Sequence, residues 1–319
     1  MRSAQDESLI DGDPEPPPTE SPSSPRNSLV KKLFSGKSSA DHPFEKNPEL
    51  KLSVNQITTY RWLFEDDVAG YRLANLDGIG LWRPKLEEFG EERAAELLAD
   101  SGLSVSSVSW VGGFTGRHGY AYDDAIQEAK ETIRTAARLN AESVIVMSGS
   151  RAGHTANHAR RLLVQALDEL ADFASEYSVR LAVQPMMKLY ERDWTFLATL
   201  DETLAVLDEC PHGNVGMVFD AYHLWQEDQL LERIPEIAPR VGLLQLSDWH
   251  REPRSQYDQA LIGDGKIPLD EILQAFIDAG YRRHCEISIW SEELWKSDYD
   301  ALLLQCRERF NSLIAAPVS

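Results

Sequence analysis

The sequence of 319 residues has few cysteines and no apolar run of membrane-spanning length. Its three cysteines, Cys210, Cys285 and Cys306, have neither paired spacing nor a zinc-binding pattern, so we expect no disulfide framework and a reducing compartment. The acidic first residues, MRSAQDESLIDGD, lack the apolar stretch of a secretory signal. Together these absences predict a cytoplasmic protein that has no membrane partner.

Basic residues are also scarce, because 32 Lys and Arg face 52 Asp and Glu and give a formal net charge of −20. The first 48 residues carry eight acidic and six basic side chains, which leaves −18 for the rest of the chain. A surface of this sign repels a phosphate backbone. We therefore expect no nucleic-acid partner.

The first 48 residues differ in composition from the remainder. They contain eight of the 16 prolines and the polar runs DPEPPPTESPSSP and SGKSS. Such a segment buries too little apolar surface to offset the entropy lost on ordering. We expect residues 1–48 to form a disordered tail that is dispensable for folding and whose partner is unknown. Residues 49–319 fit one domain, and their number suits an α/β barrel.

From residue 50 onward, short β-rich apolar runs alternate eight times with stretches of helical period, such as 124–139 and 156–176. This alternation predicts a parallel sheet, and eight units on one chain favour a (β/α)8 TIM barrel. A doubly wound open sheet is the alternative, but no glycine-rich dinucleotide motif follows the first strand. The expected strands are Leu52–Gln56, Gly78–Trp82, Ser104–Trp110, Ser143–Ser148, Arg180–Gln184, Val215–Asp220, Val241–Ser247 and Cys285–Ile289.

In such barrels the active site forms at the carboxyl ends of the strands. Among the residues expected there, only Asp220, Asp248 and Glu286 carry charge, so the sequence predicts a polar pocket with little charge. The residues at or near these strand ends are Gln56, Trp82, Trp110, Ser148, Gln184, Asp220, Gln245, Asp248, Glu286 and Ser288.

Several segments, in the same order, resemble the sugar phosphate isomerase/epimerase family of xylose isomerase-like barrels. They include LSVNQITTYRW, GIGLWRPKLEEFG, GLSVSSVSWVGGF, GMVFDAYHLW, LLQLSDW, IGDGKIPLDEIL and IWSEELW, and they run from about Leu52 to about Phe310. The resemblance implies a barrel that binds a small sugar, polyol or derivative at the carboxyl ends of its strands. Substrates vary widely on one fold, so the resemblance does not identify the compound.

Members of that family hold one divalent metal through two glutamates, an aspartate and a histidine. Position by position, the resemblance places Gln184, Asp220, Gln245 and Ser288 at these sites, so that Asp220 is the only retained ligand. Amides and hydroxyls are weak ligands, and neither accepts a proton as a general base does. We therefore expect no metal or other cofactor, unless Mn, Mg or Zn is held through Asp220 and Glu286.

Four side chains remain as catalytic candidates: Asp220, His223, Glu286 and Asp248. Glu286 precedes Ser288 by two residues, which puts both on one strand face, where Glu286 could act as a base. The alternative is a structural carboxylate one layer lower in the barrel, bonded to inward polar groups. Asp220 and His223 have an alternative too, in which they bond to each other and fix a loop.

The substrate-binding candidates share a position at or near the expected strand ends. Aromatic faces there suit a sugar or polyol, although tryptophans that cap the core would give the same pattern. The turn Gly263–Gly265 could offer N–H groups to a phosphate or be only a turn. The candidates are Gln184, Gln245, Ser288, Trp82, Trp249 and Arg254.

Six other histidines show no shared ligand spacing, and we interpret them as surface or loop residues. They are His118, His154, His158, His212, His250 and His284.

Two functions stay open: an isomerase or epimerase (or a related lyase) with a rebuilt site, and a non-catalytic sugar-binding or regulatory protein. A metal-dependent apurinic endonuclease on this fold would need more metal ligands and a basic DNA face. A homo-oligomer is compatible with either function.

Overall fold

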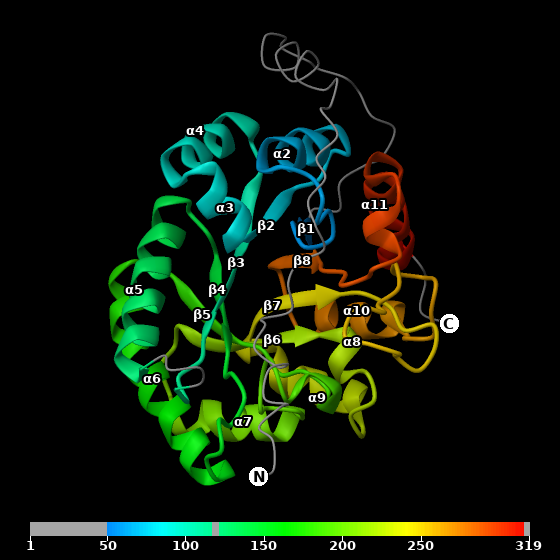
Figure 1. Cartoon of the computed structure of the whole chain (residues 1–319). Helices are drawn as coiled ribbons and strands as arrows, with labels where there is room; N and C mark the ends of the chain where they lie inside the picture. Colours follow the sequence, from blue (N-terminus) through cyan, green and yellow to red (C-terminus); the bar gives the residue numbers. More distant parts are fainter. Residues whose placement is uncertain (1–49, 117–120, 316–319) are drawn as a thin grey trace, which may run out of the picture. The chain divides into compact units, whose positions relative to one another are not determined.

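Eight parallel strands form a closed barrel in the computed structural model, which describes residues 50–116 and 121–315 (Figure 1). The strands pair in sequence order, and β8 pairs with β1 to close the sheet. The (β/α)8 barrel expected from the sequence is therefore confirmed. The tail expected over residues 1–48 lies outside the described residues.

All eight expected strands are present, and their ends differ from the expected ones by at most two residues. The fifth strand, for example, ends at Val183, one residue before the expected end at Gln184. The strands are β1 Lys51–Asn55, β2 Gly78–Trp82, β3 Ser104–Gly112, β4 Ser143–Met147, β5 Arg180–Val183, β6 Val215–Asp220, β7 Val241–Leu246 and β8 His284–Ile287.

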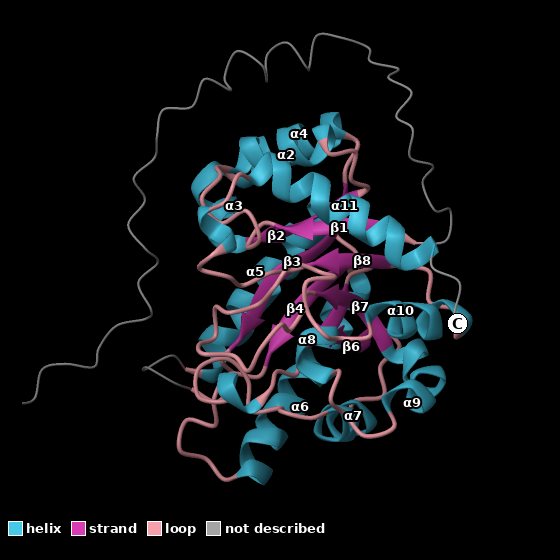
Figure 2. Cartoon of the chain, turned by 90° about the vertical axis from the view of Figure 1, so that its right-hand side faces the viewer, coloured by secondary structure: helices cyan, strands magenta, loops and turns pink. Residues whose placement is uncertain are grey.

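Helices surround the strands on the outside of the barrel (Figure 2). The helix at 156–176 is typical, because Leu163, Leu167 and Leu170 lie on one buried face and the Thr155 side chain caps the first turn. The α-helices are α2 Phe64–Leu73, α3 Arg83–Phe89, α4 Glu91–Ser101, α5 Tyr122–Arg138, α6 Ala156–Glu176, α7 Leu200–Glu209, α8 Ala221–Leu224, α9 Leu230–Ile237, α10 Leu269–Asp278 and α11 Tyr299–Ala315. Short 3-10 helices are η2 Lys188–Tyr190, η3 Ala238–Arg240 and η4 Leu294–Lys296.

The barrel interior contains a small apolar cluster and a set of buried polar side chains. Strands β4 to β7 contribute a small buried apolar cluster of Ile145, Ala182, Val218 and Leu243, against which Trp110 packs. Strands β1, β3 and β8 instead contribute buried polar side chains, with Glu286 among them. Burying a carboxylate is costly unless it is hydrogen-bonded, so its partners decide what this residue can do.

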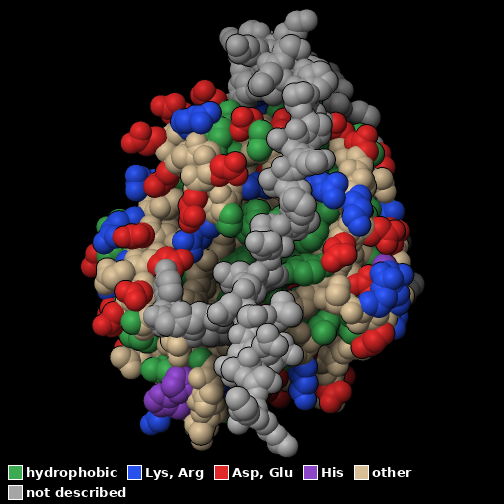
Figure 3. Space-filling model, viewed as in Figure 1, with side chains coloured by type: hydrophobic (Ala, Val, Ile, Leu, Met, Phe, Trp, Pro, Cys, Tyr) green, Lys and Arg blue, Asp and Glu red, His purple; other side chains and the backbone are tan. Residues whose placement is uncertain are grey.

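The three cysteines are free, as the absence of paired spacing predicted, and all three are buried. Within the described residues, no helix combines the length and the apolar character that crossing a membrane requires. On the face shown in Figure 3, acidic side chains are spread among Lys and Arg side chains.

Candidate functional site

The carboxyl ends of β5, β6 and β7 bring three candidate residues together. The Nε2 atom of Gln184 donates to Oε1 of Gln245 at 2.9 Å and lies 3.4 Å from Oδ2 of Asp220. The β6–β7 register explains part of this, because Asp220 pairs directly with Gln245. Ser288 follows β8 and is held beside β7 by a bond from its N–H to the carbonyl of Leu246. All four candidates are buried.

Glu286 is wholly buried and accepts four hydrogen bonds. Its Oε1 accepts from Nδ2 of Asn55 at 3.0 Å and from Nε2 of Gln245 at 2.9 Å. Its Oε2 accepts from the hydroxyls of Ser106 at 2.6 Å and Ser107 at 2.7 Å. A carboxylate has about four acceptor sites, so these bonds occupy it. The geometry favours a structural carboxylate over a base or a metal ligand.

Three partners of Glu286, namely Asn55, Ser106 and Ser107, are residues that reading the sequence did not single out. Gly80 makes the room, since a Cβ atom there would lie 2.3 Å from Oε2 of Glu286. A shift of register between β2 and β3 adds Ser106 as an extra residue, so two successive serines reach the same carboxylate. In the sequence, Gly78 and Gly80 lie two residues apart and so on one strand face. This pair of glycines was the feature that could have indicated a close approach of another side chain.

Asp220 and His223 are neighbours, but their side chains do not form a hydrogen bond. Oδ1 of Asp220 accepts from the N–H of Tyr222 at 2.9 Å, while Nε2 of His223 lies 3.7 Å from Oδ2. Burial raises the pKa of Asp220 to about 7, an effect that its hydrogen bonds only partly offset. Burial also lowers the pKa of His223 to about 3. At neutral pH the imidazole is therefore uncharged.

Several buried polar atoms at this end have no hydrogen-bond partner among the described residues. They include both ring nitrogens of His223 and the Nε1 atoms of Trp225 and Trp249. Ring contacts through Tyr222 place these side chains in one group: Tyr222 touches His223 and Trp249, and Trp249 touches Trp225. Buried polar atoms in native proteins are usually satisfied, so this group is suited to a ligand that carries several hydroxyls.

The Asp248 carboxylate accepts hydrogen bonds from backbone N–H groups. Its Oδ1 accepts from the N–H of Trp249 and Ile267, and its Oδ2 accepts from the N–H of Gly263 and Gly265 at 2.9 Å each. A Cβ atom at Gly265 would lie 2.1 Å from Oδ1, so glycine is needed for this approach. The carboxylate thus anchors the turn, and two N–H groups of Gly263–Gly265 point at Asp248 instead of at a phosphate.

The remaining aromatic candidates form a continuous series of ring contacts. Trp82 is half-buried, with its ring centroid 5.3 Å from that of Tyr60. From Tyr60 the contacts pass through Trp295, Tyr257, Trp290 and Tyr190 to His223. Trp290 also contacts Trp110 and Trp194. Arg254 lies apart from this series on the surface, where it forms an ion pair with Asp258.

His284 is not a surface or loop residue, contrary to the sequence interpretation. It begins β8, is wholly buried, and its ring nitrogens lie 2.7 Å from the hydroxyl of Ser104 and 3.0 Å from the carboxylate of Glu142. Gly78 provides the space, because a Cβ atom there would lie 2.9 Å from Nε2. His284 lies at the amino-terminal end of its strand, whereas Asp220 lies at the carboxyl-terminal end of β6. His118 lies outside the described residues.

Asp220 and His223 should act on stability in opposite senses as the pH changes. The pKa of His223 is lowered from 6.5 to about 3. Its contribution to the stability of the folded state is therefore complete above pH 6.5 and is lost as the pH falls. The pKa of Asp220 is raised from 3.8 to about 7, so its contribution is present below pH 3.8 and is lost as the pH rises toward 7.

Replacing Asp220 with Asn should therefore expose the His223 effect. Between about pH 6.5 and pH 4 the variant should lose stability more steeply than the parent, by up to about 1.4 kcal/mol per pH unit. Urea unfolding at several pH values measures this, with the exposed Asp270→Asn as a control. Equal slopes for parent and variant would mean that Asp220 does not titrate in this range.

Comparisons with known proteins support the fold. Residues 69–305 match the family described as the xylose isomerase-like TIM barrel. Fructoselysine 3-epimerase of Escherichia coli O157:H7 is 21% identical over 253 residues, covering 75% of this chain and 89% of that protein. Inosose isomerase of Bacillus velezensis is 19% identical over 207 residues, covering 63% of this chain and 72% of that protein.

Two solved structures show the same fold at low identity. Protein SMc04130 from Sinorhizobium meliloti 1021 has a TM-score of 0.77 and 24% identity, over 82% of this chain and 98% of that one. The IOLI protein, whose structure has a bound zinc atom, has a TM-score of 0.74 and 18% identity, over 83% and 98% respectively.

Proposed function

The chain belongs to the xylose isomerase-like TIM barrel family, and on this basis we propose that it binds a small sugar, polyol or derivative without a divalent metal at its strand ends. The relatives named inosose isomerase and fructoselysine 3-epimerase are named for polyhydroxy compounds, which supports the substrate class. A net charge of −20 and free buried cysteines support a cytoplasmic protein without a nucleic-acid partner.

The side chains at the family's metal positions do not fit a divalent cation. In the proposed correspondence, Gln184, Gln245 and Ser288 replace ligands, and only Asp220 retains a negative charge. Both side-chain groups of Gln245 are already used, since Oε1 accepts from Gln184 and Nε2 donates to Glu286. Divalent cations obtain most of their attraction from carboxylates, with imidazole as the other strong ligand. No step of the proposed function therefore uses a metal here.

One observation carries the binding proposal: His223, Trp225 and Trp249 have unpartnered buried polar atoms, and His223 lies beside Asp220 at the end of an aromatic series. A buried polar atom without a partner costs about 1–3 kcal/mol. A ligand with several hydroxyls would satisfy these atoms while its C–H face packs on the rings. Gln184, Gln245, Ser288 and Trp82 complete the proposed binding surface.

If the barrel is an enzyme of the isomerase or epimerase class, Asp220 is the group we propose for proton transfer. Burial raises its pKa to about 7, which suits a general acid or base near neutral pH. The neutral His223 beside it would hold a substrate hydroxyl. Glu286 and Asp248, both saturated by donors, would serve the structure.

A non-catalytic binding protein is the second candidate, and the bonding of Glu286 favours it. Moving a proton between two carbons uses groups placed on both sides of the substrate. Among the described carboxylates proposed for catalysis, the bonds to Glu286 and Asp248 leave only Asp220 available.

Binding should survive removal of metal ions. We expect protein treated with EDTA to bind a member of a panel of ketoses, polyols and inositols, measured by calorimetry. Trp82→Ala should weaken the binding about tenfold, because it removes an aromatic face. Tyr177→Ala, at an exposed aromatic beyond the end of α6, should change nothing. Binding that appears only after a divalent metal is added would contradict the proposal.

Deuterium exchange separates the two candidate functions. An enzyme should transfer solvent deuterium to a carbon of the bound sugar, detected by NMR, and Asp220→Asn should abolish the transfer. A ligand that binds without exchange would identify the non-catalytic protein.

A further inference from the structure

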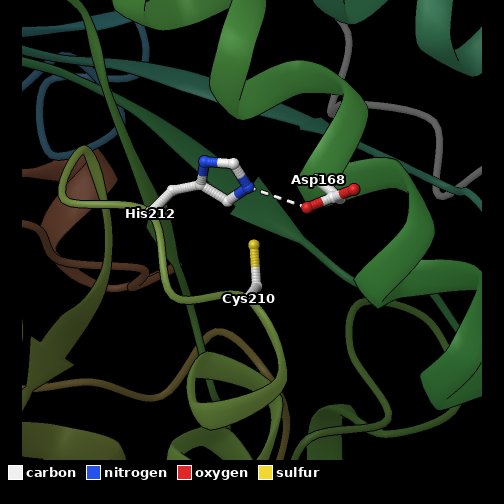
Figure 4. A group of neighbouring side chains, drawn as sticks. All are labelled: Asp168, Cys210 and His212. Atoms are coloured by element: carbon white, nitrogen blue, oxygen red, sulfur yellow. Dashed lines mark hydrogen bonds and ion pairs between the residues drawn. The ribbon is translucent and has the colours of Figure 1, made fainter.

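A second group of polar side chains lies outside the barrel, where the loop between α7 and β6 meets α6 (Figure 4). Asp168 comes from α6, while Cys210 and His212 come from the loop. One ligand atom of each residue lies within 4.8 Å of the others. Figure 4 shows the Cys210 thiol directed toward the space between the His212 ring and the Asp168 carboxylate. His212 is a loop residue, as the sequence indicated, but it is not isolated.

Local structure holds the three residues in place. The N–H of His212 donates to the carbonyl of Cys210 at 2.8 Å, so both residues belong to one tight turn. Asn214 then donates from Nδ2 to the carbonyl of Ala171 at 2.8 Å, which fastens the loop to α6. Because α6 is a 21-residue helix packed along the barrel, Asp168 is presented from a rigid element.

Each nitrogen of the His212 ring faces a carboxylate. Nε2 lies 2.7 Å from Oδ1 of Asp168, and Nδ1 lies 3.8 Å from Oδ1 of Asp172. The two aspartates are four residues apart on α6, which puts them on one helix face. A metal-binding histidine usually has its second ring nitrogen directed at a carboxylate, which orients the ring. Asp172 has this position, and it is an observation independent of the three ligand atoms.

We propose that Asp168, Cys210 and His212 bind one zinc ion, with water completing the coordination and Asp172 orienting the His212 ring. Sulfur, imidazole and carboxylate together form a donor set that zinc accepts, whereas magnesium and calcium prefer oxygen alone. With bonds of about 2.0–2.3 Å, tetrahedral ligand atoms stand roughly 3.3–3.8 Å apart. Asp168 is exposed and can turn to lengthen its contact with His212.

Cobalt titration of the full chain, stripped with chelator, tests the proposal. Co²⁺ bound by a thiolate gives a charge-transfer absorption band in the near ultraviolet, and added zinc should remove it by competition. Cys210→Ser should lose the band, whereas Cys306→Ser should keep it. Should either cysteine variant fail to fold, Asp168→Asn at the surface still tests the site and should bind cobalt at least tenfold more weakly.

Asp172→Asn distinguishes a positioning role from a surface charge effect. It should weaken cobalt binding about 10–100-fold but leave the band intact at saturation. Glu131→Gln removes an exposed carboxylate from the neighbouring α5 and should leave the affinity unchanged. A folded parent protein without a charge-transfer band, or a band that persists in Cys210→Ser, would overturn the proposal.

Discussion

Replacing Glu286 with alanine should lower the free energy of unfolding by about 3–5 kcal/mol. The change leaves the donors of Asn55, Gln245, Ser106 and Ser107 without their acceptor in the barrel centre. It also opens a cavity where the side chain was wholly buried. Unfolding in urea, followed by circular dichroism, measures the loss.

Two further variants show whether the bonds or the burial are responsible. Glu286→Gln keeps the shape and one acceptor oxygen, so it should cost less than alanine. Glu271→Ala removes an exposed glutamate of α10 and should change stability by less than about 0.5 kcal/mol. A loss below about 1 kcal/mol for Glu286→Ala would mean that the four bonds do not stabilise the barrel.

The sequence was sufficient to predict the barrel and to predict which strand ends lie close together. Short β-rich apolar runs that alternate with stretches of helical period mark each unit, and parallel strands place their carboxyl ends at one edge. Gln184, Asp220 and Gln245 therefore had to lie near each other, and they do. The β6–β7 register, in which Asp220 faces Gln245, makes this contact close.

The bonding of each carboxylate could not be predicted in the same way. Strict alternation would turn only one of Ser106 and Ser107 inward, but the register shift between β2 and β3 lets both reach Glu286. Asp248 likewise receives N–H groups from a turn 15 to 19 residues later, which depends on how that loop folds back.

The proposed zinc site was hidden for a similar reason. Cys210 and His212 are close in sequence, but Asp168 lies 44 residues before His212 on a helix. Only the packing of the α7–β6 loop on α6 joins them. A helix face with Asp168 and Asp172 is common on solvent-exposed helices, so neither half of the site is distinctive alone.

Restoring the family's charges at the strand ends should restore metal binding there. The variant combines Gln184→Glu, Gln245→His and Ser288→Glu in a Cys210→Ser background, which removes the proposed zinc site. Without metal it should lose about 3–5 kcal/mol, because buried carboxylates would repel Asp220 and lack a cation. Manganese at 100 times its Kd should return about 2.7 kcal/mol by binding the folded state.

Melting temperature as a function of manganese concentration provides the measurement, and elemental analysis provides the matched control. Purified Cys210→Ser with the natural strand ends should contain no stoichiometric divalent metal, and manganese should leave its melting temperature unchanged. About one metal ion per chain in that control would show that Asp220 and its neighbours still form a metal site, whatever happens at Cys210. If the triple variant folds but manganese does not stabilise it, the positions of Gln184, Gln245 and Ser288 do not converge on one ion. The inference that they replace metal ligands would then be wrong, while the proposed zinc site outside the barrel would be unaffected.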